Sequence, residues 1–284
     1  MKLRQVIANI KSELEFKYGT RETEWMIRDI MEYLKGYSAV DIVLHREDEV
    51  SLFITNRIKK IIMRLLENEP LQYILGEARF CGHKFKVTPA TLIPRPETQE
   101  LVDMIVKENQ QTDLSVLDIG TGSGCIAISL ARALKFPKVR AIDISPTAID
   151  VAKENAINLK VKVDFIEKDM LQLDGMEDSC TYDIIVSNPP YIAESESSGM
   201  DANVLDYEPA TALFVPDDNP LLFYKAITDY ACYALKPEGR LYFEINPRYV
   251  NELSKYISDK GFSEINVYKD MQARNRFITA TRNG

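Results

Sequence analysis

The stretch that decides the fold lies between residues 116 and 124 and reads Val116-Leu117-Asp118-Ile119-Gly120-Thr121-Gly122-Ser123-Gly124. Its apolar first half is typical of a buried strand, and the apolar spacing over 126–134 predicts a helix directly after it. Glycines between a strand and a helix let the backbone turn tightly and approach a ligand closely. A Walker loop is excluded because its Gly-Lys-Ser/Thr ending is absent, and the glycines stand closer together than in the dinucleotide fingerprint. The stretch therefore indicates a nucleoside-binding loop, although a glycine loop alone is a weak signal.

Strand and helix patterns alternate on the C-terminal side of this loop. Further strands are predicted over 139–144, 161–166, 183–187 and 240–245, with two more at the C-terminal end. Helices are predicted over 146–159, 221–235 and 249–260. Strands that alternate with helices predict an α/β fold with a doubly wound, mostly parallel sheet. The acidic segment 193–219 has weak periodicity, and loops of that length are often functional or mobile.

The first part of the chain has a different pattern. Helical spacing over 3–14, 25–34 and 50–66 predicts a small helical bundle in residues 1–70, closed by Pro70. Residues 71–95 contain Tyr73-Ile74-Leu75, then Phe80, Phe85 and Val87, punctuated by Gly76 and Gly82. That pattern predicts a β-hairpin, followed by a proline-rich connector. We therefore expect three parts: the bundle (1–70), a hairpin linker (71–95) and the α/β domain (96–284).

Polar residues follow the carboxyl ends of successive predicted strands, where open α/β sheets bind their ligands. Asp143 lies 19 residues after Gly124, and an acid there can accept hydrogen bonds from both hydroxyls of a ribose. Asp169 could accept the amino group of adenine, and Met170 could pack on the ring. The predicted cofactor residues are Ile119, Gly120, Thr121, Gly122, Ser123, Gly124, Asp143, Ile144, Asp169, Met170 and Asn188.

The sequence Asn188-Pro189-Pro190-Tyr191 follows the apolar strand 183–187. Proline fixes φ and lacks a backbone donor, so the carbonyls of Asn188 and Pro189 can face a ligand. The Asn188 side chain adds an acceptor, and Tyr191 offers a ring face for stacking. This combination suits the recognition of a flat, NH2-bearing group. The alternative interpretation is a Pro-Pro loop breaker with asparagine as the turn residue.

Composition and charge limit the classes of function. The net charge is −8, and because residues 1–75 hold 12 basic and 12 acidic side chains, the rest of the chain carries all of it. An acidic α/β part does not suit direct, stable nucleic-acid binding, and a basic protein partner fits it better. Four scattered cysteines and two histidines predict neither a metal site nor a disulfide framework. With no signal-peptide pattern and no membrane-spanning run, we expect a cytoplasmic protein.

Several motifs together resemble one known family. They are Pro70 to Gly76, Leu92-Ile93-Pro94-Arg95-Pro96-Glu97-Thr98, the glycine loop, Asn188 to Tyr191, and Tyr207-Glu208-Pro209 before Ala212-Leu213. The chain resembles class I S-adenosylmethionine-dependent methyltransferases, and more narrowly the PrmC/HemK family of protein-(glutamine-N5) methyltransferases. The resemblance extends over nearly the whole chain. It implies a Rossmann-like domain with a mixed sheet, S-adenosylmethionine as cofactor with S-adenosylhomocysteine as product, and a monomer.

The resemblance also implies the reaction and its residues. The acceptor would be the glutamine of the Gly-Gly-Gln loop in class 1 peptide-chain release factors, with the N-terminal helical domain docking that protein. Asn188 Oδ1 and the Pro189 carbonyl would accept the two amide hydrogens, Pro190 would rigidify the turn, and Tyr191 would cover the amide. Arg95 and Glu208 are candidates on the substrate side, or alternatively an ion pair that braces the loop.

Two positions depart from the family pattern. Gln99 stands where an acid is common, and Ile245-Asn246-Pro247 follows Glu244 where a glycine is common. Other functions also stay open. The same Asn-Pro-Pro-Tyr element occurs in adenine and cytosine amino-methyltransferases, which act on a flipped base. A methyltransferase for a ribosomal-protein glutamine and a cofactor-binding module without catalysis are further alternatives.

Overall fold

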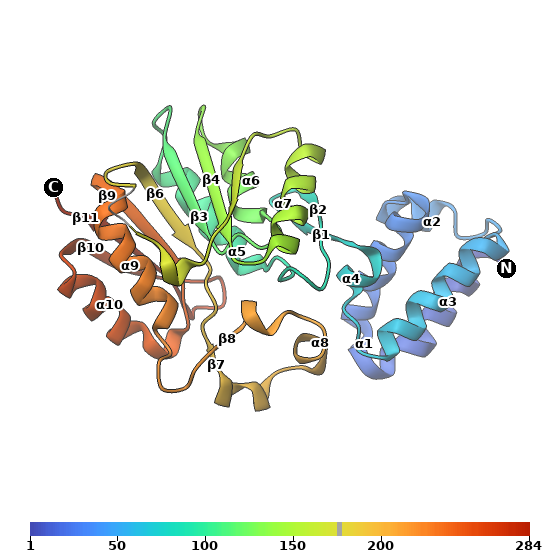
Figure 1. The fold of residues 1–284 in the computed structure, drawn as a ribbon. Helices are drawn as coiled ribbons and strands as arrows, with labels where there is room; N and C mark the ends of the chain where they lie inside the picture. The colour runs from blue at the N-terminus through green and yellow to red at the C-terminus, as the bar shows by residue number, and fades with distance from the viewer. Residues whose placement is uncertain (175–177) are drawn as a thin grey trace. The chain divides into compact units, whose positions relative to one another are not determined.

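The computed structural model describes residues 1–174 and 178–284, which form two compact units (Figure 1). The first unit comprises Met1–Gly76 together with Asp201–Tyr207. The second comprises Glu77–Met200 and Glu208–Gly284. No helix in the described part of the chain is long and apolar enough to cross a membrane.

The first unit is helical. Its helices are α1 (Leu3–Lys35), α2 (Ala39–Leu44), α3 (Leu52–Leu66), α4 (Leu71–Leu75) and α8 (Ala202–Leu205). The predicted helices over 3–14 and 25–34 are two parts of α1, which is interrupted at Gly19 with φ 74° and ψ 166°. Apolar side chains of α1, α3 and α4 bury one another in a single core that includes Ile10, Ile30 and Leu65. Tyr207, at the end of the 201–207 segment, donates its hydroxyl to the Glu67 carbonyl at 2.9 Å.

Two local predictions for this region were wrong or incomplete. Residues 73–75 do not belong to the hairpin but to helix α4, which begins after Pro70 and ends at Gly76 in the left-handed conformation (φ 75°). The hairpin itself is shorter, β1 (Glu77–Phe80) paired antiparallel with β2 (His83–Lys86). Helix α2 was not predicted, although Ser38 and Asp41 form a capping box at its start.

The second unit is built on a seven-stranded sheet with the order β10-β11-β9-β6-β3-β4-β5. The strands are β3 (Ser115–Ile119), β4 (Lys138–Asp143), β5 (Asp164–Glu167), β6 (Tyr182–Ser187), β9 (Leu235–Glu244), β10 (Phe262–Lys269) and β11 (Asn275–Arg282). The first five pair in parallel, whereas β11 runs antiparallel to β9 and to β10. The predicted α/β fold with a mixed, mostly parallel sheet is therefore confirmed.

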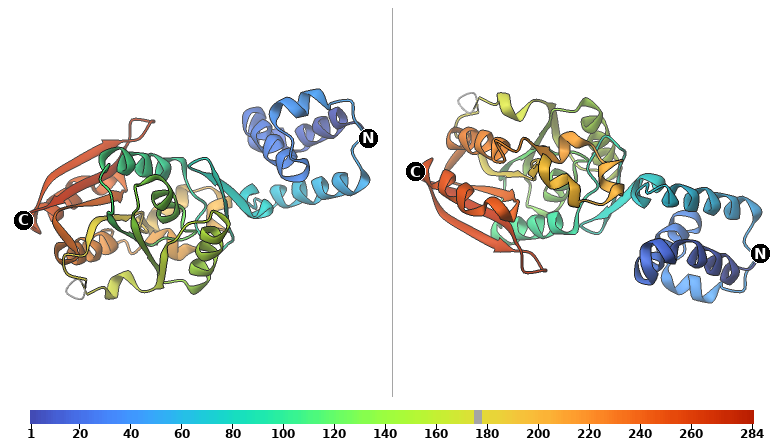
Figure 2. Two further views of the ribbon diagram at one scale, coloured as in Figure 1. Left: turned by 90° about the horizontal axis from the view of Figure 1, so that it is seen from above. Right: turned by 90° about the horizontal axis from the view of Figure 1, so that it is seen from below.

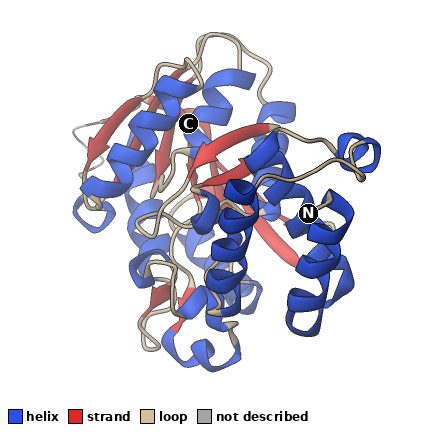
Figure 3. Ribbon diagram, turned by 90° about the vertical axis from the view of Figure 1, so that its right-hand side faces the viewer, coloured by secondary structure: helices blue, strands red, loops and turns tan. Residues whose placement is uncertain are grey.

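Helices cover both faces of this sheet (Figures 2 and 3). The helices α5 (Pro96–Glu108), α6 (Cys125–Ala133) and α7 (Pro146–Asn158) share one apolar core with the hairpin, and α9 (Leu222–Ala234) and α10 (Val250–Asp259) share the other. Neighbouring strand residues point to opposite faces: Val116 belongs to the first core and Leu117 to the second. The central strands β3 and β6 are buried on both faces, which explains why they read as continuous apolar runs.

Some boundaries differ from the prediction for identifiable reasons. Strand β5 begins at Asp164 rather than at 161, because Val161 N donates to the Ala156 carbonyl and closes the end of α7. The weakly patterned segment 193–219 contains short elements instead of an unstructured loop. These are the parallel pair β7 (Ile192–Ala193) and β8 (Phe214–Val215), helix α8, and the 3-10 helices η2 (Glu194–Gly199) and η3 (Ala210–Ala212).

Candidate active site

A cleft opens at the carboxyl ends of β3, β4 and β6. Several segments that are distant in sequence form its wall. The lining residues that bear on the chemistry are Arg95, Thr98, Gly120, Thr121, Gly122, Ser123, Asp143, Ile144, Met170, Asn188 and Pro190.

The glycine loop is held by backbone hydrogen bonds to the neighbouring strand. Gly120 N and Thr121 N both donate to the carbonyl of Ile142, at 2.9 and 3.0 Å. Gly124, the N-cap of α6, has φ 79°, and a Cβ there would lie 3.0 Å from Ala152 Cβ in α7. The loop therefore needs glycine at this position both for its backbone conformation and for the close packing of two helices.

Asp118 lies buried beneath the glycine loop. Its Oδ2 accepts the Thr121 hydroxyl at 2.6 Å and the Ala127 amide at 3.2 Å. Burial raises the pKa of this carboxyl to about 7, in spite of these two hydrogen bonds. Its Oδ1 is buried and has no partner among the residues described. A carboxyl in this environment binds its proton much more tightly than one in water.

Asp143 stands at the end of β4, with its carboxylate beside the glycine loop. Its Oδ2 accepts the Gly122 amide at 2.8 Å, and its Oδ1 accepts the Ser145 amide at 2.9 Å. Burial raises its pKa, and the backbone hydrogen bonds oppose that shift. Backbone hydrogen bonds come from Ser145, Gly122 and Ile144, and since a carboxylate has about four acceptor positions, Asp143 keeps capacity for a hydroxyl donor from a ligand. Ile144 follows it in the cleft wall and is 56% exposed.

Asp169 and Met170 were both predicted to contact the cofactor, and of these two residues only Met170 lines the cleft. Met170 is buried and lines the cleft, where its Cε lies 3.2 Å from the position of a Cβ on Gly120. The Asp169 side chain instead caps the 3-10 helix η1 (Met170–Gln172), accepting Leu171 N and Gln172 Nε2, both at 2.9 Å. A contact of Asp169 with an adenine amino group stays a prediction.

Asn188 follows β6 and lies in the cleft wall with Pro190. Its Nδ2 donates to Thr98 Oγ1 at 3.2 Å, and no residue described in the structure donates to its Oδ1. Pro189 and Pro190 are both buried, and Pro189 is not among the residues that line the cleft. The asparagine amide is thus held at its nitrogen, with its oxygen available as an acceptor.

Tyr191 does not line the cleft in this structure. Its ring packs against the core, and its hydroxyl donates to Glu244 Oε1 at 3.1 Å. Burial, followed by the nearby Glu244 carboxylate, raises the pKa of Tyr191. Its carbonyl accepts Asn246 Nδ2 at 3.1 Å. These contacts anchor the turn after Pro190, whereas the predicted cover over an acceptor amide stays a prediction.

The two substrate-side candidates form an ion pair. Glu208 is buried, with 1% of its side chain exposed, and accepts Arg95 Nη2 at 2.5 Å and Ile93 N at 3.2 Å. Because Glu208 bonds to both Ile93 and Arg95, it braces the segment that leads into α5. Arg95 itself lines the cleft with about a third of its side chain exposed, so it is also within reach of a ligand.

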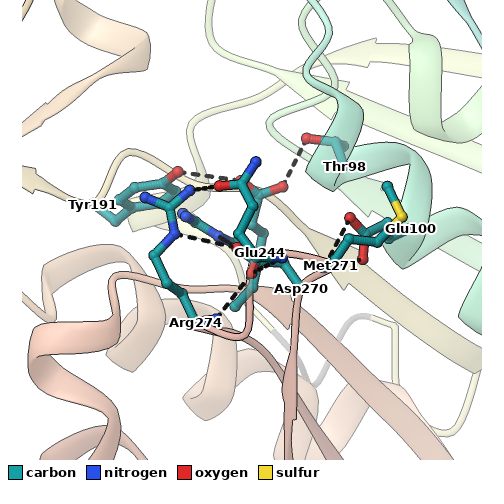
Figure 4. A network of polar contacts seen from close by, with 9 residues as sticks. Thr98, Glu100, Tyr191, Glu244, Asp270, Met271 and Arg274 are labelled. Atoms are coloured by element: carbon teal, nitrogen blue, oxygen red, sulfur yellow. Dashed lines mark hydrogen bonds and ion pairs between the residues drawn. The ribbon is translucent and has the colours of Figure 1, made fainter.

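Sequence reasoning missed the residues that support Asn188. Thr98 and Glu244 were noted only as parts of motifs, yet Thr98 Oγ1 donates to Glu244 Oε2 at 2.7 Å (Figure 4). Asn246, noted as a departure from the family pattern, contacts the Tyr191 carbonyl. Gln99, the other departure, accepts Cys81 N at 3.0 Å and joins the hairpin turn to α5. The motif Ile-Pro-Arg-Pro-Glu-Thr was the available signal for Thr98, because Arg95 in the same motif was already a candidate on the substrate side.

Comparison with known proteins agrees with this architecture. The family model of the PrmC N-terminal domain matches residues 5–76, and that of the methyltransferase small domain matches residues 96–206. The crystal structure of a methyltransferase from Pyrococcus furiosus matches with a TM-score of 0.53 at 17% identity, over 78% of this chain and 98% of that one. The second unit is therefore a methyltransferase domain of the class I fold.

The sequences of curated relatives narrow the family. A release factor glutamine methyltransferase of Bacteroides thetaiotaomicron is 44% identical over 280 residues, which are 99% of this chain and all of that protein. Another, of Lactococcus lactis, is 38% identical over 97% of this chain and 98% of its own length. The chain belongs to the family of release factor glutamine methyltransferases, as its motifs predicted.

Proposed function

We propose that this protein transfers a methyl group from S-adenosylmethionine to the side-chain amide nitrogen of the glutamine in the Gly-Gly-Gln motif of class 1 peptide-chain release factors. The observation that carries the proposal is the state of Asn188. This residue lines the cleft and uses its nitrogen for a contact with Thr98, which leaves its oxygen as a hydrogen-bond acceptor. An acceptor at this place suits a substrate group that carries N–H hydrogens.

The glycine loop and Asp143 form the side of the cleft that would bind the methyl donor, here called the donor side, and their arrangement fits the cofactor. The Asp143 carboxylate keeps acceptor capacity for the ribose, and Met170 lies in the wall near Gly120, where a flat ring could pack. Gly120 to Gly124 would border the amino-acid part of the cofactor. When bound, S-adenosylmethionine supplies a methyl group that its positively charged sulfur already activates.

The task of the protein is then to bind and orient the acceptor amide. An amide nitrogen is a weak nucleophile because its lone pair is delocalised into the carbonyl. Asn188 Oδ1 and the Pro189 carbonyl would each accept one N–H, which fixes the nitrogen in line for the transfer. Orientation of this kind contributes about 7–11 kcal/mol in favourable systems. The proton released after transfer would leave to water, so no strong base is required.

We further propose that the helical unit, here Met1–Gly76 with Asp201–Tyr207, docks the release factor. The chain leaves the methyltransferase domain at 201 and re-enters it at Glu208. The last residue of this excursion, Tyr207, is hydrogen-bonded to the Glu67 carbonyl of the helical unit. Binding of a release factor with and without its Gly-Gly-Gln loop would test this role, because docking predicts that most of the affinity remains.

Mass spectrometry tests the proposed reaction. A purified class 1 release factor is incubated with the protein and S-adenosylmethionine, and the Gly-Gly-Gln peptide is fragmented to locate any added methyl group. The proposal predicts one methyl group on the glutamine side-chain nitrogen. Parallel incubations with ribosomal proteins and with total DNA and RNA serve as controls. Methylation only of one of these, or of none of the substrates, would contradict the proposal.

A further inference from the structure

A short relay of hydrogen bonds runs from the protein core to the candidate catalytic asparagine. It starts at Glu244, the last residue of β9, which is 1% exposed. The two carboxylate oxygens of Glu244 accept different hydroxyls: Oε2 accepts Thr98 Oγ1 at 2.7 Å, and Oε1 accepts Tyr191 Oη at 3.1 Å. Figure 4 shows Thr98 and Tyr191 meeting at this carboxylate. In both contacts the hydroxyl donates and a carboxylate oxygen accepts.

The relay fixes which end of the Asn188 amide faces Thr98. The single hydroxyl hydrogen of Thr98 is used in the bond to Glu244, so its oxygen can only accept a second hydrogen bond. Asn188 Nδ2, at 3.2 Å, supplies that donor. A flipped amide would place Oδ1 against an oxygen without a hydrogen, which leaves two acceptors facing each other. The carboxylate of Glu244 therefore determines, through Thr98, that the nitrogen of Asn188 faces inward.

Opposing effects act on the pKa of Glu244. Burial raises its pKa, and this effect is opposed by the hydrogen bonds from Thr98 and Tyr191 and by the positive charge of Arg276. Arg276 has only 12% of its side chain exposed and is itself bonded to Asp270, 3.2 Å away. The cation is thus held in place by a second buried carboxylate, independently of any ligand.

From this geometry we propose that Thr98 and Glu244 are positioning residues, which orient the Asn188 amide so that Oδ1 faces the acceptor nitrogen. The proposal rests on the proposed function, because it assumes that Asn188 binds an N–H of the substrate. In this proposal Thr98 acts through Asn188, whose Nδ2 it accepts. Without the relay, the amide would turn between two orientations, only one of which offers an acceptor to the substrate.

Three substitutions separate positioning from simple bracing. Thr98→Val keeps the side-chain shape but removes the hydroxyl, and we expect kcat to fall roughly 10- to 100-fold, with little change in the dissociation constant of S-adenosylmethionine. Thr98→Ser keeps the hydroxyl and should restore kcat to within about threefold of the wild type. Thr228→Val is the matched control, because Thr228 is a buried threonine in α9 whose hydroxyl has no partner among the described residues. Its kcat should equal that of the wild type.

A double-mutant cycle then tests the route through Asn188. In an Asn188→Ala background, Thr98→Val should cause no further loss of single-turnover rate, because the group that it positions is gone. An additive loss, or an unchanged kcat in Thr98→Val accompanied only by a lower melting temperature, would overturn the proposal. If the wild type transfers no methyl group to glutamine, the proposed function fails instead. An active wild type with a fully active Thr98→Val variant refutes the relay alone.

Discussion

The donor side and the acceptor side of the cleft are held in place by different means. The donor side consists of the glycine loop and Asp143, and backbone amides make most of its contacts, such as those of Gly120 and Thr121 with Ile142. The acceptor side depends on side chains that are far apart in sequence: 90 residues separate Asn188 from Thr98, and 146 separate Thr98 from Glu244. Changes on the two sides should therefore affect different properties, namely cofactor binding and turnover.

The largest effect is expected on the acceptor side, from Asn188→Ala. Loss of the amide removes a preorganised acceptor for the substrate nitrogen, and we expect kcat to fall roughly 10²- to 10³-fold. The affinity for S-adenosylmethionine should change by no more than about threefold, because backbone groups and Asp143 form the donor side. Initial rates and isothermal titration calorimetry measure the two quantities. Equal losses of kcat and cofactor affinity would mean that the two sides are not independent.

Asp118, which lies beneath the glycine loop, is expected to make the free energy of unfolding depend on pH. Burial raises the pKa of Asp118 to about 7 in the folded protein, above an unfolded value near 4. The native state thus binds this proton more tightly, so the stability that it contributes is complete below about pH 4 and is lost as pH rises through 7. Between pH 5 and pH 8 the wild type should lose about 3 kcal/mol of unfolding free energy relative to Asp118→Asn.

Urea unfolding of both proteins at the two pH values measures this difference. Asp118→Asn keeps an oxygen that can accept from Thr121 and Ala127 but cannot titrate in this range. Groups that do not interact with Asp118 contribute equally to both proteins and cancel. A difference between the two proteins that does not change with pH would show that Asp118 is ionised throughout.

Packing beneath the glycine loop gives a somewhat smaller effect. In Gly124→Ala the new methyl group would lie 3.0 Å from both Ala152 Cβ and Ile128 Cδ1, at a φ of 79°. We expect the free energy of unfolding to fall by about 2–3 kcal/mol, from the strained backbone and the crowding together. Gly122→Ala is the matched control, since Gly122 also has a positive φ, of 54°, but no atom within 4 Å of the new Cβ. It should cost about 1 kcal/mol, and equal losses in the two variants would refute the packing argument.

The smallest effect is expected from Asp143→Ala. Removing the carboxylate takes away the acceptors for the ribose hydroxyls and the partner of Gly122 N, so cofactor affinity should fall about 10- to 30-fold. At saturating S-adenosylmethionine, kcat should stay within about threefold of the wild type, because the acceptor side is intact. Titration calorimetry and steady-state rates at high cofactor concentration check this. A large loss of kcat with unchanged affinity would reverse the assignment of the two sides.

The contrast between the donor side and the acceptor side also explains which features could be predicted from the sequence. The strands of the sheet and the glycine loop depend on contiguous patterns, apolar runs and closely spaced glycines, and these were recognised correctly. Helix α4 was missed because Tyr73-Ile74-Leu75 has strand-forming side chains within a five-residue element. The signals for a helix were at its ends, where Pro70 precedes it and Gly76 takes a positive φ after it.

The hydrogen bonds that hold the acceptor side in place could not be predicted from contiguous sequence patterns. Thr98, Asn188 and Glu244 meet only because the ends of β6 and β9 lie beside each other and the start of α5 packs near them. No local pattern encodes that meeting. Likewise, no local pattern predicts that Tyr191 bonds through its hydroxyl to Glu244 and through its carbonyl to Asn246, while its expected contact with a ligand stays a prediction.

The central claim is that the Asn188 amide presents its oxygen to the substrate nitrogen while Thr98 holds its nitrogen. The most direct measurement is a high-resolution crystal structure of the protein with S-adenosylhomocysteine and a release-factor domain that carries the glutamine. We predict that Asn188 Oδ1 lies roughly 3 Å from the glutamine side-chain nitrogen, with Nδ2 still bonded to Thr98. A glutamine bound away from Asn188, or an Asn188 amide turned with its nitrogen toward the substrate, would contradict the account.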